Sequence, residues 1–177
     1  MAIVYIGIGS NKGDRGEYIE KALELIAEIP DTSIVSQSEV KEYPAVEVCA
    51  GQADFMNGVI ELDSELLPLE LLHKLQVIER RLDRVDKGDG AERSMDLDML
   101  SYGEGIVFSG KTLMLPHPKI QSRNFVLEGL NEINPNWIHP TSKRTANELL
   151  ADLLERPNEN NPNAESSSAS SAVSQES

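Results

Sequence analysis

The chain contains the run Arg93-Ser94-Met95-Asp96-Leu97-Asp98-Met99-Leu100, in which two carboxylates alternate with apolar residues. Alternate side chains of a β-strand share one face, so Asp96 and Asp98 would point the same way, with Cα atoms about 6.7 Å apart. Two neighbouring carboxylates repel each other and resist burial unless a positive charge lies between them. Mg²⁺ prefers oxygen ligands and keeps several waters, so it suits such a pair. The alternative is a strand with a solvated face and two incidental acids.

Strand and helix signals alternate on the N-terminal side of this run. Together they predict an α+β fold with the order βαββαβ, which is the ferredoxin-like antiparallel sheet with both helices on one face. An edge hairpin and two further helices are expected after the run. The expected strands cover Ala2–Ile8, Ser33–Tyr43 and Phe55–Leu62, the helices cover about Glu17–Glu28, Pro68–Leu82, Ile120–Ile133 and Thr145–Leu154, and the hairpin joins Ile106–Phe108 to Thr112–Leu115.

Length and composition restrict the class of protein. The 177 residues suit one domain over 1–154, followed by an Asn-, Ser- and Glu-rich tail over 155–177 that is predicted to be disordered. The formal net charge of −14 argues against a nucleic-acid binder. A single cysteine, Cys49, excludes an internal disulfide and fits a reducing compartment. Without a signal peptide or a membrane-length apolar run, the chain is predicted to be soluble, cytoplasmic and free of membrane contact.

Four segments, read together, give the chain a family resemblance. It resembles 6-hydroxymethyl-7,8-dihydropterin pyrophosphokinase of the folate pathway over roughly residues 2–154. Each segment is weakly specific alone, but the set falls in the family's order and close to its spacing. The matching segments are Tyr5-Ile6-Gly7-Ile8-Gly9-Ser10-Asn11-Lys12-Gly13-Asp14-Arg15, Asp54-Phe55-Met56-Asn57-Gly58-Val59, Arg93 to Leu100, and Leu115-Pro116-His117-Pro118 with Arg123-Asn124-Phe125.

The resemblance implies transfer of the terminal diphosphate of ATP to the hydroxymethyl oxygen of the reduced pterin, leaving AMP. ATP and this pterin would be the small-molecule partners of a monomeric enzyme. Asp96 and Asp98 match the family's metal-binding aspartates, which implies two Mg²⁺ ions that clamp phosphate oxygens. Phosphoryl transfer depends mainly on alignment and charge neutralisation, so no protein nucleophile is required.

The resemblance also assigns the nucleotide contacts. Arg84, Arg93, His117 and Arg123 match positions that contact ATP phosphates or help to close the site, and Arg84 and Arg93 join the aspartates as the predicted catalytic residues. A planar guanidinium can hold phosphate oxygens in two directions. Gln76 and Glu79 match nucleotide-contacting positions and share a helix face. A solvated surface charge is the alternative for each arginine, and a structural role is the alternative for His117.

The pterin contacts come from three further segments. Phe55 and Phe125 match the ring-contacting aromatics, and Asn57 matches the amide that reads the pterin edge. Plain core packing is the alternative for either phenylalanine. Tyr43, Pro44 and Val46 match the loop that touches the pterin, mainly through its backbone. The lids expected to close over the site are Tyr43–Ala53 and Arg84–Arg93.

Three positions depart from the family pattern. Asp89-Gly90-Ala91-Glu92 replaces the usual Trp-Gly-Pro before the arginine of the aspartate strand, Tyr43 replaces a smaller threonine, and Met114 stands where a hydroxyl residue is common. The first departure concerns closure more than the metal site. Three alternatives therefore remain open: a catalytically impaired homologue, a ferredoxin-like ligand-binding module, and diphosphate transfer to a different small alcohol.

Overall fold

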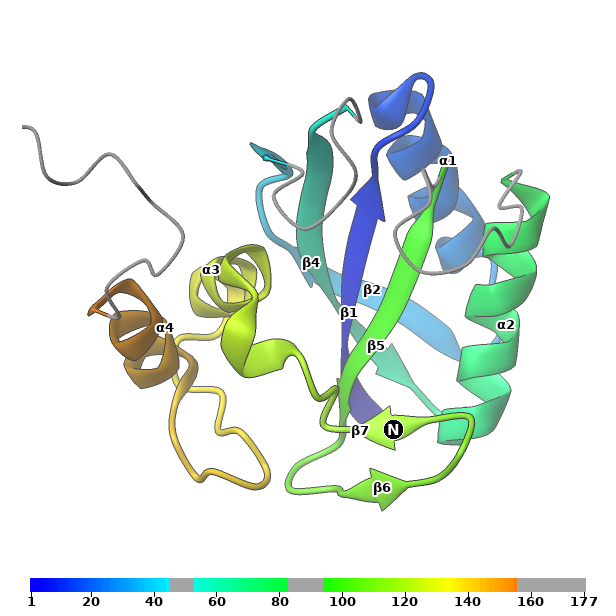
Figure 1. Ribbon diagram of the computed structural model, residues 1–177. Coiled ribbons are helices and arrows are strands. Elements are labelled where there is room, and N and C mark those ends of the chain that lie inside the picture. Colours follow the sequence, from blue (N-terminus) through cyan, green and yellow to red (C-terminus); the bar gives the residue numbers. More distant parts are fainter. Residues whose placement is uncertain (45–52, 83–93, 156–177) are drawn as a thin grey trace, which may run out of the picture.

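A computed structural model describes residues 1–44, 53–82 and 94–155 of the chain (Figure 1). Within these residues, no helix has the length and apolar character needed to cross a membrane. In chain order the elements are β1 Ala2–Ser10, α1 Arg15–Ala27, β2 Thr32–Gln37, β3 Lys41–Tyr43, β4 Phe55–Ser64, α2 Pro68–Arg81, β5 Asp96–Tyr102, β6 Phe108–Ser109, β7 Met114–Leu115, the 3-10 helix η1 Ile120–Ser122, α3 Asn124–Ile133 and α4 Ala146–Glu155.

The main sheet has the strand order β2-β4-β1-β5, with β3 also paired to β4. All four strand pairs are antiparallel. This order and the sequence βαββαβ confirm the predicted ferredoxin-like arrangement. Strand β1 lies inside the sheet, between β4 and β5. Its residues from Val4 to Ser10 are all buried, as expected for a strand covered on both faces.

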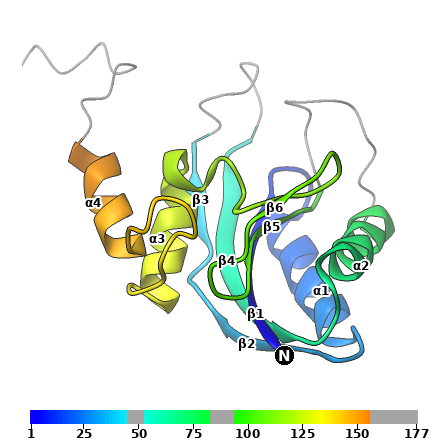
Figure 2. The ribbon, with the colours of Figure 1, turned by 90° about the horizontal axis from the view of Figure 1, so that it is seen from below.

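Helices cover both faces of the sheet (Figure 2). Helices α1 and α2 pack on one face, as predicted, where Ile6, Ile8 and Leu75 belong to the larger core cluster. Helices α3 and α4 lie on the other side, over a smaller cluster that includes Tyr5 and Leu100. The alternation along β1 and β5 therefore sends neighbouring side chains into two separate cores.

Local signals explain where α1 and α2 begin. Asp14 caps α1, because its Oδ1 accepts a hydrogen bond of 3.0 Å from the backbone N–H of Glu17. Pro68 occupies the first position of α2, where the missing N–H is tolerated. The backbone N–H of Leu67, just before it, donates to Glu70 Oε2 at 3.0 Å. Both starts lie within two residues of the predicted ones.

The prediction of one strand over Ser33–Tyr43 was wrong. The segment forms two strands, β2 and β3, separated by residues 38–40. Gln37 pairs with Ile60 and Lys41 pairs with Asn57, so the three residues 38–40 lie opposite only two residues of β4, 58 and 59. Ser38 carries this bulge: its N–H donates to Val59 O at 2.9 Å, and its Oγ accepts from Val59 N–H at 2.9 Å. A bulge bends its strand and redirects the side chains beyond it.

The prediction of one helix over Ile120–Ile133 was also wrong. A 3-10 turn, η1, is followed by Arg123 in an extended conformation (φ −108°, ψ 111°), and only then does α3 begin. The predicted hairpin is present as β6 and β7, but these strands form a two-stranded sheet of their own. Strand β7 contacts β5 without extending the main sheet.

Candidate active site

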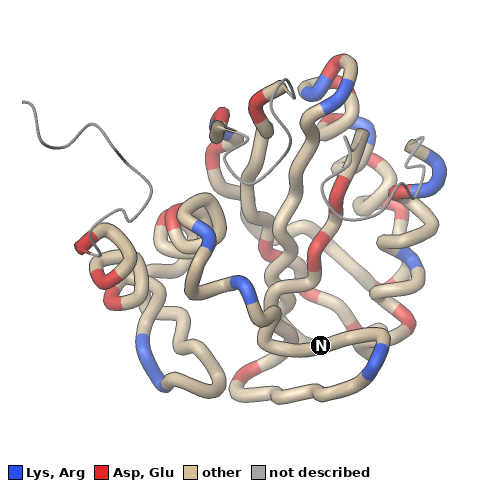
Figure 3. The backbone as a smooth tube through the Cα atoms, viewed as in Figure 1, with Lys and Arg blue, Asp and Glu red and all other residues tan. Residues whose placement is uncertain are grey.

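The two aspartates of β5 share one face of the sheet. Leu97 and Met99 point into the core under α1 and α2, whereas Leu100 belongs to the core under α3. By alternation Asp96 and Asp98 face the α3 side, and both are half-buried. Figure 3 shows acidic positions along β5 and basic positions in the segment that leads into α3.

Glycines of β1 form the floor beside the aspartates. In the strand register Gly9 lies opposite Asp96 and Gly7 opposite Asp98. On its other side Gly9 lies opposite Asn57 of β4, and a Cβ on Gly9 would stand 2.3 Å from Asn57 Oδ1. The missing side chain thus makes room for the amide of Asn57, whose residue is only 7% exposed. Asn57, Gly9 and Asp96 form one row across three strands.

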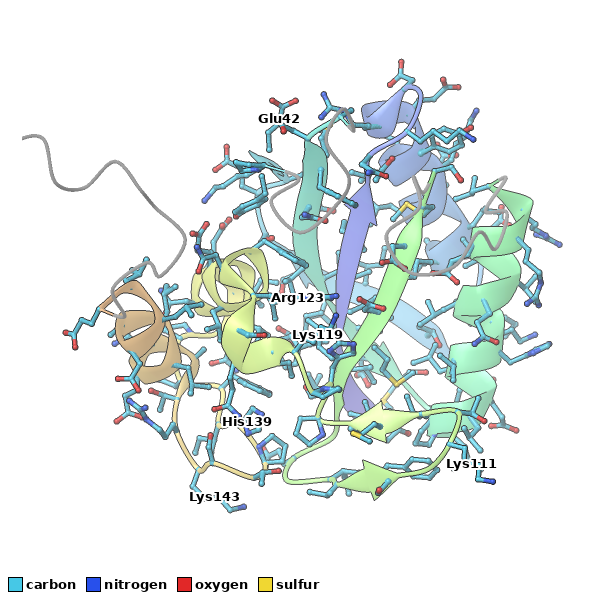
Figure 4. All side chains as sticks on the ribbon, in the orientation of Figure 1. Glu42, Lys111, Lys119, Arg123, His139 and Lys143 are labelled. Atoms are coloured by element: carbon cyan, nitrogen blue, oxygen red, sulfur yellow. The ribbon has the colours of Figure 1, made fainter. Side chains whose placement is uncertain are left out.

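A cation pairs with the acidic strand. Arg123 Nη1 donates to Asp98 Oδ2 at 2.9 Å, with side-chain exposures of 27% and 31%. Figure 4 shows Arg123 reaching from the start of α3 toward the sheet. The extended backbone of Arg123, between η1 and α3, gives it this direction. The guanidinium carbon also lies 5.8 Å from the ring centroid of Phe125.

His117 is anchored beside the acidic strand. Its backbone N–H donates to Leu100 O at 2.8 Å, and Leu100 lies at the register shift between β1 and β5. Burial lowers the pKa of the His117 ring, an effect that Asp98 opposes and Arg123 reinforces. Nδ1 accepts the N–H of Lys119 at 3.1 Å, so the neutral ring carries its proton on Nε2. His117 can therefore offer one N–H donor near neutral pH.

Aromatic side chains lie beside Arg123. The rings of Tyr43 and Phe125 stand 5.8 Å apart, centroid to centroid. Tyr43 also donates its hydroxyl to Glu128 Oε2 at 2.7 Å, and burial followed by this bond raises the tyrosine pKa. Phe55 lies opposite Tyr43 in the β3–β4 pair and shares a face with Asn57. The site thus has an aromatic wall next to a buried amide.

Comparison with known proteins shows to which family the chain belongs. The family model of 7,8-dihydro-6-hydroxymethylpterin-pyrophosphokinase (HPPK) matches residues 5–135. The chain belongs to the HPPK family. A relative from Aquifex aeolicus named 2-amino-4-hydroxy-6-hydroxymethyldihydropteridine pyrophosphokinase is 34% identical over 157 residues, covering 89% of this chain and 96% of that protein. One from Pseudomonas aeruginosa with the same name is 36% identical over 148 residues, covering 84% and 90%.

Solved structures support the HPPK fold. A Plasmodium falciparum HPPK-DHPS structure with pterin and p-hydroxybenzoate matches with a TM-score of 0.68 at 14% identity, covering 88% of this chain and 43% of that one. An HPPK-DHPS structure in complex with substrates matches with a TM-score of 0.66 at 13% identity, covering 87% and 44%. This chain thus spans less than half the length of those chains.

The structure brings together most of the predicted HPPK site residues that it describes. Asp96, Asp98, His117, Arg123, Phe125, Tyr43, Phe55 and Asn57 lie around the α3 face of the sheet. Pro44 is exposed at the end of β3, and Gln76 is half-buried on α2. Outside the described residues lie Val46, Arg84 and Arg93. The same holds for the whole expected lid Arg84–Arg93, for residues 45–52 of the expected lid Tyr43–Ala53, and for the tail after Glu155.

Glu79 is placed differently from the other predicted nucleotide contacts. Its residue is 5% exposed on α2, and its Oε1 accepts the backbone N–H of Leu97 at 2.8 Å. Three residues that shape the site were not among the predicted site residues. Gly7 and Gly9 carried a readable signal, because alternate glycines in a strand leave one face open. Glu128, the partner of Tyr43, carried none, because only the packing of α3 against β3 reveals it.

The donor set fits magnesium better than a metal that needs a complete protein cage. Among residues 1–44, 53–82 and 94–155 there is no cluster of three or more His, Cys, Asp or Glu that could hold a metal. Mg²⁺ typically takes one or two carboxylates and fills its remaining positions with water and substrate phosphates. Asp96 and Asp98 supply two carboxylates on one face, beside glycines of β1, and they suit that pattern.

Proposed function

We propose that the chain transfers the terminal diphosphate of ATP to the hydroxymethyl oxygen of 6-hydroxymethyl-7,8-dihydropterin. The pterin oxygen bonds to the β-phosphorus, and the bond from that phosphorus to the oxygen bridging it to the α-phosphorus breaks. The bridging oxygen leaves with AMP, and the hydroxyl proton is released. The observation that carries the proposal is the row Asn57, Gly9 and Asp96, which places a buried amide and an acidic strand on either side of a glycine.

Asp96 and Asp98 are proposed to hold two Mg²⁺ ions. When bound, the ions neutralise and clamp the phosphate oxygens of the nucleotide. The two carboxylates serve this purpose because they share a face and are half-buried, so their charge is screened less than on an open surface. Asp98 holds the guanidinium of Arg123 at 2.9 Å, which shows that its carboxylate can accept a charged partner here.

Arg123 and His117 are proposed to contact the phosphates. Arg123 has a guanidinium at the acidic pair and can direct further N–H groups toward an anion. His117 offers Nε2–H because its Nδ1 is engaged by the N–H of Lys119. Arg84 and Arg93, outside the described residues, are proposed for the same task, and Gln76 is proposed to contact the nucleotide. The arginines among these residues would supply the positive charge that holds a polyanion near a chain of net charge −14.

The aromatic wall and Asn57 are proposed to bind the pterin. Phe125 and Phe55 offer ring faces to a flat heterocycle, and the amide of Asn57 can both donate and accept at its edge. Tyr43 and Pro44 lie at the same end, with Val46 beyond them in the chain. Binding both substrates in this geometry supplies alignment, which is the main contribution a protein makes to phosphoryl transfer.

One assay separates this proposal from its alternatives. The protein is mixed with ATP, Mg²⁺ and hydroxymethyldihydropterin, and AMP is quantified with and without the pterin. Pterin-dependent AMP supports the proposal, and Asp96→Asn should abolish it without lowering the melting temperature. Binding of both ligands without AMP would indicate an impaired homologue, and AMP formed only with another alcohol would change the acceptor. A monomeric, cytoplasmic state stays a prediction.

A further inference from the structure

Strand β5 lies at one edge of the main sheet, in the order β2-β4-β1-β5. Its inner side pairs with β1, and α2 packs beside it. In an antiparallel strand the N–H groups of successive residues point to opposite edges, so half of the N–H groups of an edge strand lack a partner strand. A buried backbone N–H needs another acceptor. Among the described residues, the acidic pair is therefore carried by a strand that pairs with one neighbouring strand of the main sheet, β1.

Glu79 supplies that acceptor at the residue between the two aspartates. The N–H of Leu97 donates to Glu79 Oε1 at 2.8 Å, and the two residues are 4% and 5% exposed. Leu97 points into the core under α1 and α2, whereas its neighbours Asp96 and Asp98 face the α3 side. The bond thus joins the backbone of the acidic strand to α2, the helix that packs on the sheet face opposite the aspartates.

Helix α2 is a rigid support for this bond. Leu71, Leu75 and Ile78 of α2 are 0%, 0% and 4% exposed and belong to the larger core cluster. Leu75 lies one turn before Glu79, so the carboxylate projects from the face of the helix that is packed against the sheet. Burying a carboxylate costs free energy that its hydrogen bonds must offset, so its presence here calls for a reason beyond packing.

We propose that Glu79 is a positioning residue that fixes the backbone of β5 between Asp96 and Asp98 and so holds the two carboxylates in metal-binding geometry. The inference rests on the proposed function, because it concerns the same acidic pair. Groups that orient metal ligands through hydrogen bonds typically change metal affinity about 10- to 100-fold when altered. The effect passes through the Leu97 backbone and needs no contact between Glu79 and the nucleotide.

Two variants separate the length of this side chain from its charge. Glu79→Gln keeps the length and a carbonyl oxygen that can accept the Leu97 N–H, while Glu79→Asp keeps the carboxyl group but is one methylene too short. Leu75→Ala is the control for stability, because it opens the same helix–sheet contact without touching that bond. Each protein is titrated with Mn²⁺ in the presence of a non-hydrolysable ATP analogue and followed by electron paramagnetic resonance, and hydrogen exchange of the Leu97 amide is recorded by NMR.

The expected result is that Glu79→Asp weakens Mn²⁺ binding about tenfold and exposes the Leu97 amide to exchange. Glu79→Gln keeps both properties closer to the wild type, and Leu75→Ala lowers the melting temperature but keeps the Mn²⁺ affinity. The reverse order, with Gln weaker than Asp, would show that charge matters and would overturn the inference. Equal affinities in all four proteins would overturn it as well. A wild type that binds no Mn²⁺ would refute the proposed function itself, and this inference with it.

Discussion

Replacing Gly9 by alanine should disable the pterin subsite while leaving the fold intact. The added Cβ would stand 2.3 Å from Asn57 Oδ1, a separation that real Cβ contacts do not show, so the amide must rotate away. Alanine is otherwise favourable in a strand interior by about 0.5–1 kcal/mol, so the stability of the protein should change little. A displaced amide loses one or two hydrogen bonds to the pterin edge, each contributing about 0.5–1.5 kcal/mol. The dissociation constant for the pterin should therefore rise by roughly 2- to 150-fold.

The assay is calorimetric titration with hydroxymethyldihydropterin in the presence of Mg²⁺ and a non-hydrolysable ATP analogue. Gly7→Ala is the matched control, because its Cβ would make only ordinary contacts of 3.5 Å with Leu100 and 3.8 Å with Asp98. We expect that control to keep wild-type pterin affinity, and Asn57→Ala to reproduce the loss. The reasoning is refuted if Gly9→Ala binds the pterin as tightly as wild type, or if Gly7→Ala loses as much.

Three further predictions follow from other contacts. Arg123→Ala should lower the rate of AMP formation about 100-fold, as loss of one charge-stabilising donor typically does. Arg123→Lys should have a rate between those of the wild type and Arg123→Ala, and an unchanged rate in Arg123→Ala would exclude the phosphate role. Gly129→Ala should destabilise the protein by about 1–3 kcal/mol in urea unfolding, since its Cβ would meet Val59 Cγ2 at 2.6 Å, and an unaltered midpoint would argue against that packing. Burial lowers the pKa of His139, and its Nδ1 accepts two backbone N–H groups, so the unfolded chain takes up the proton first. Its stabilising contribution is complete above pH of about 6.5 and is lost on acidification, so the melting temperature should fall less between pH 7 and 5 in His139→Gln than in wild type.

The order of elements was predictable because each element carries its own periodic signal. Helical spacing and strand alternation are local properties, and they gave βαββαβ with both helices on one face. The two errors concern places where a distant residue overrides the local signal. Residues 38–40 leave the strand because Ser38 bonds twice to Val59 on β4. Arg123 interrupts the expected helix, and its ion pair with Asp98 joins segments 25 residues apart.

The candidate site was predictable only as a list of residues. Spacing alone placed Asp96 and Asp98 on one face, and the family resemblance supplied the other positions. What the sequence could not reveal is register: only the pairing of β1 with both β4 and β5 brings Asn57, Gly9 and Asp96 into one row. Nor could it reveal that the carboxylate of Glu79 turns to the backbone of Leu97, because that contact depends on how α2 packs beside an edge strand.

The most direct measurement is a crystal structure of the protein with a non-hydrolysable ATP analogue and Mn²⁺, recorded where manganese scatters anomalously. The account predicts two anomalous peaks within coordination distance of the Asp96 and Asp98 carboxylates, with the phosphates of the analogue on their far side. A bound nucleotide whose phosphates lie away from β5, with no peak beside either carboxylate, would contradict it.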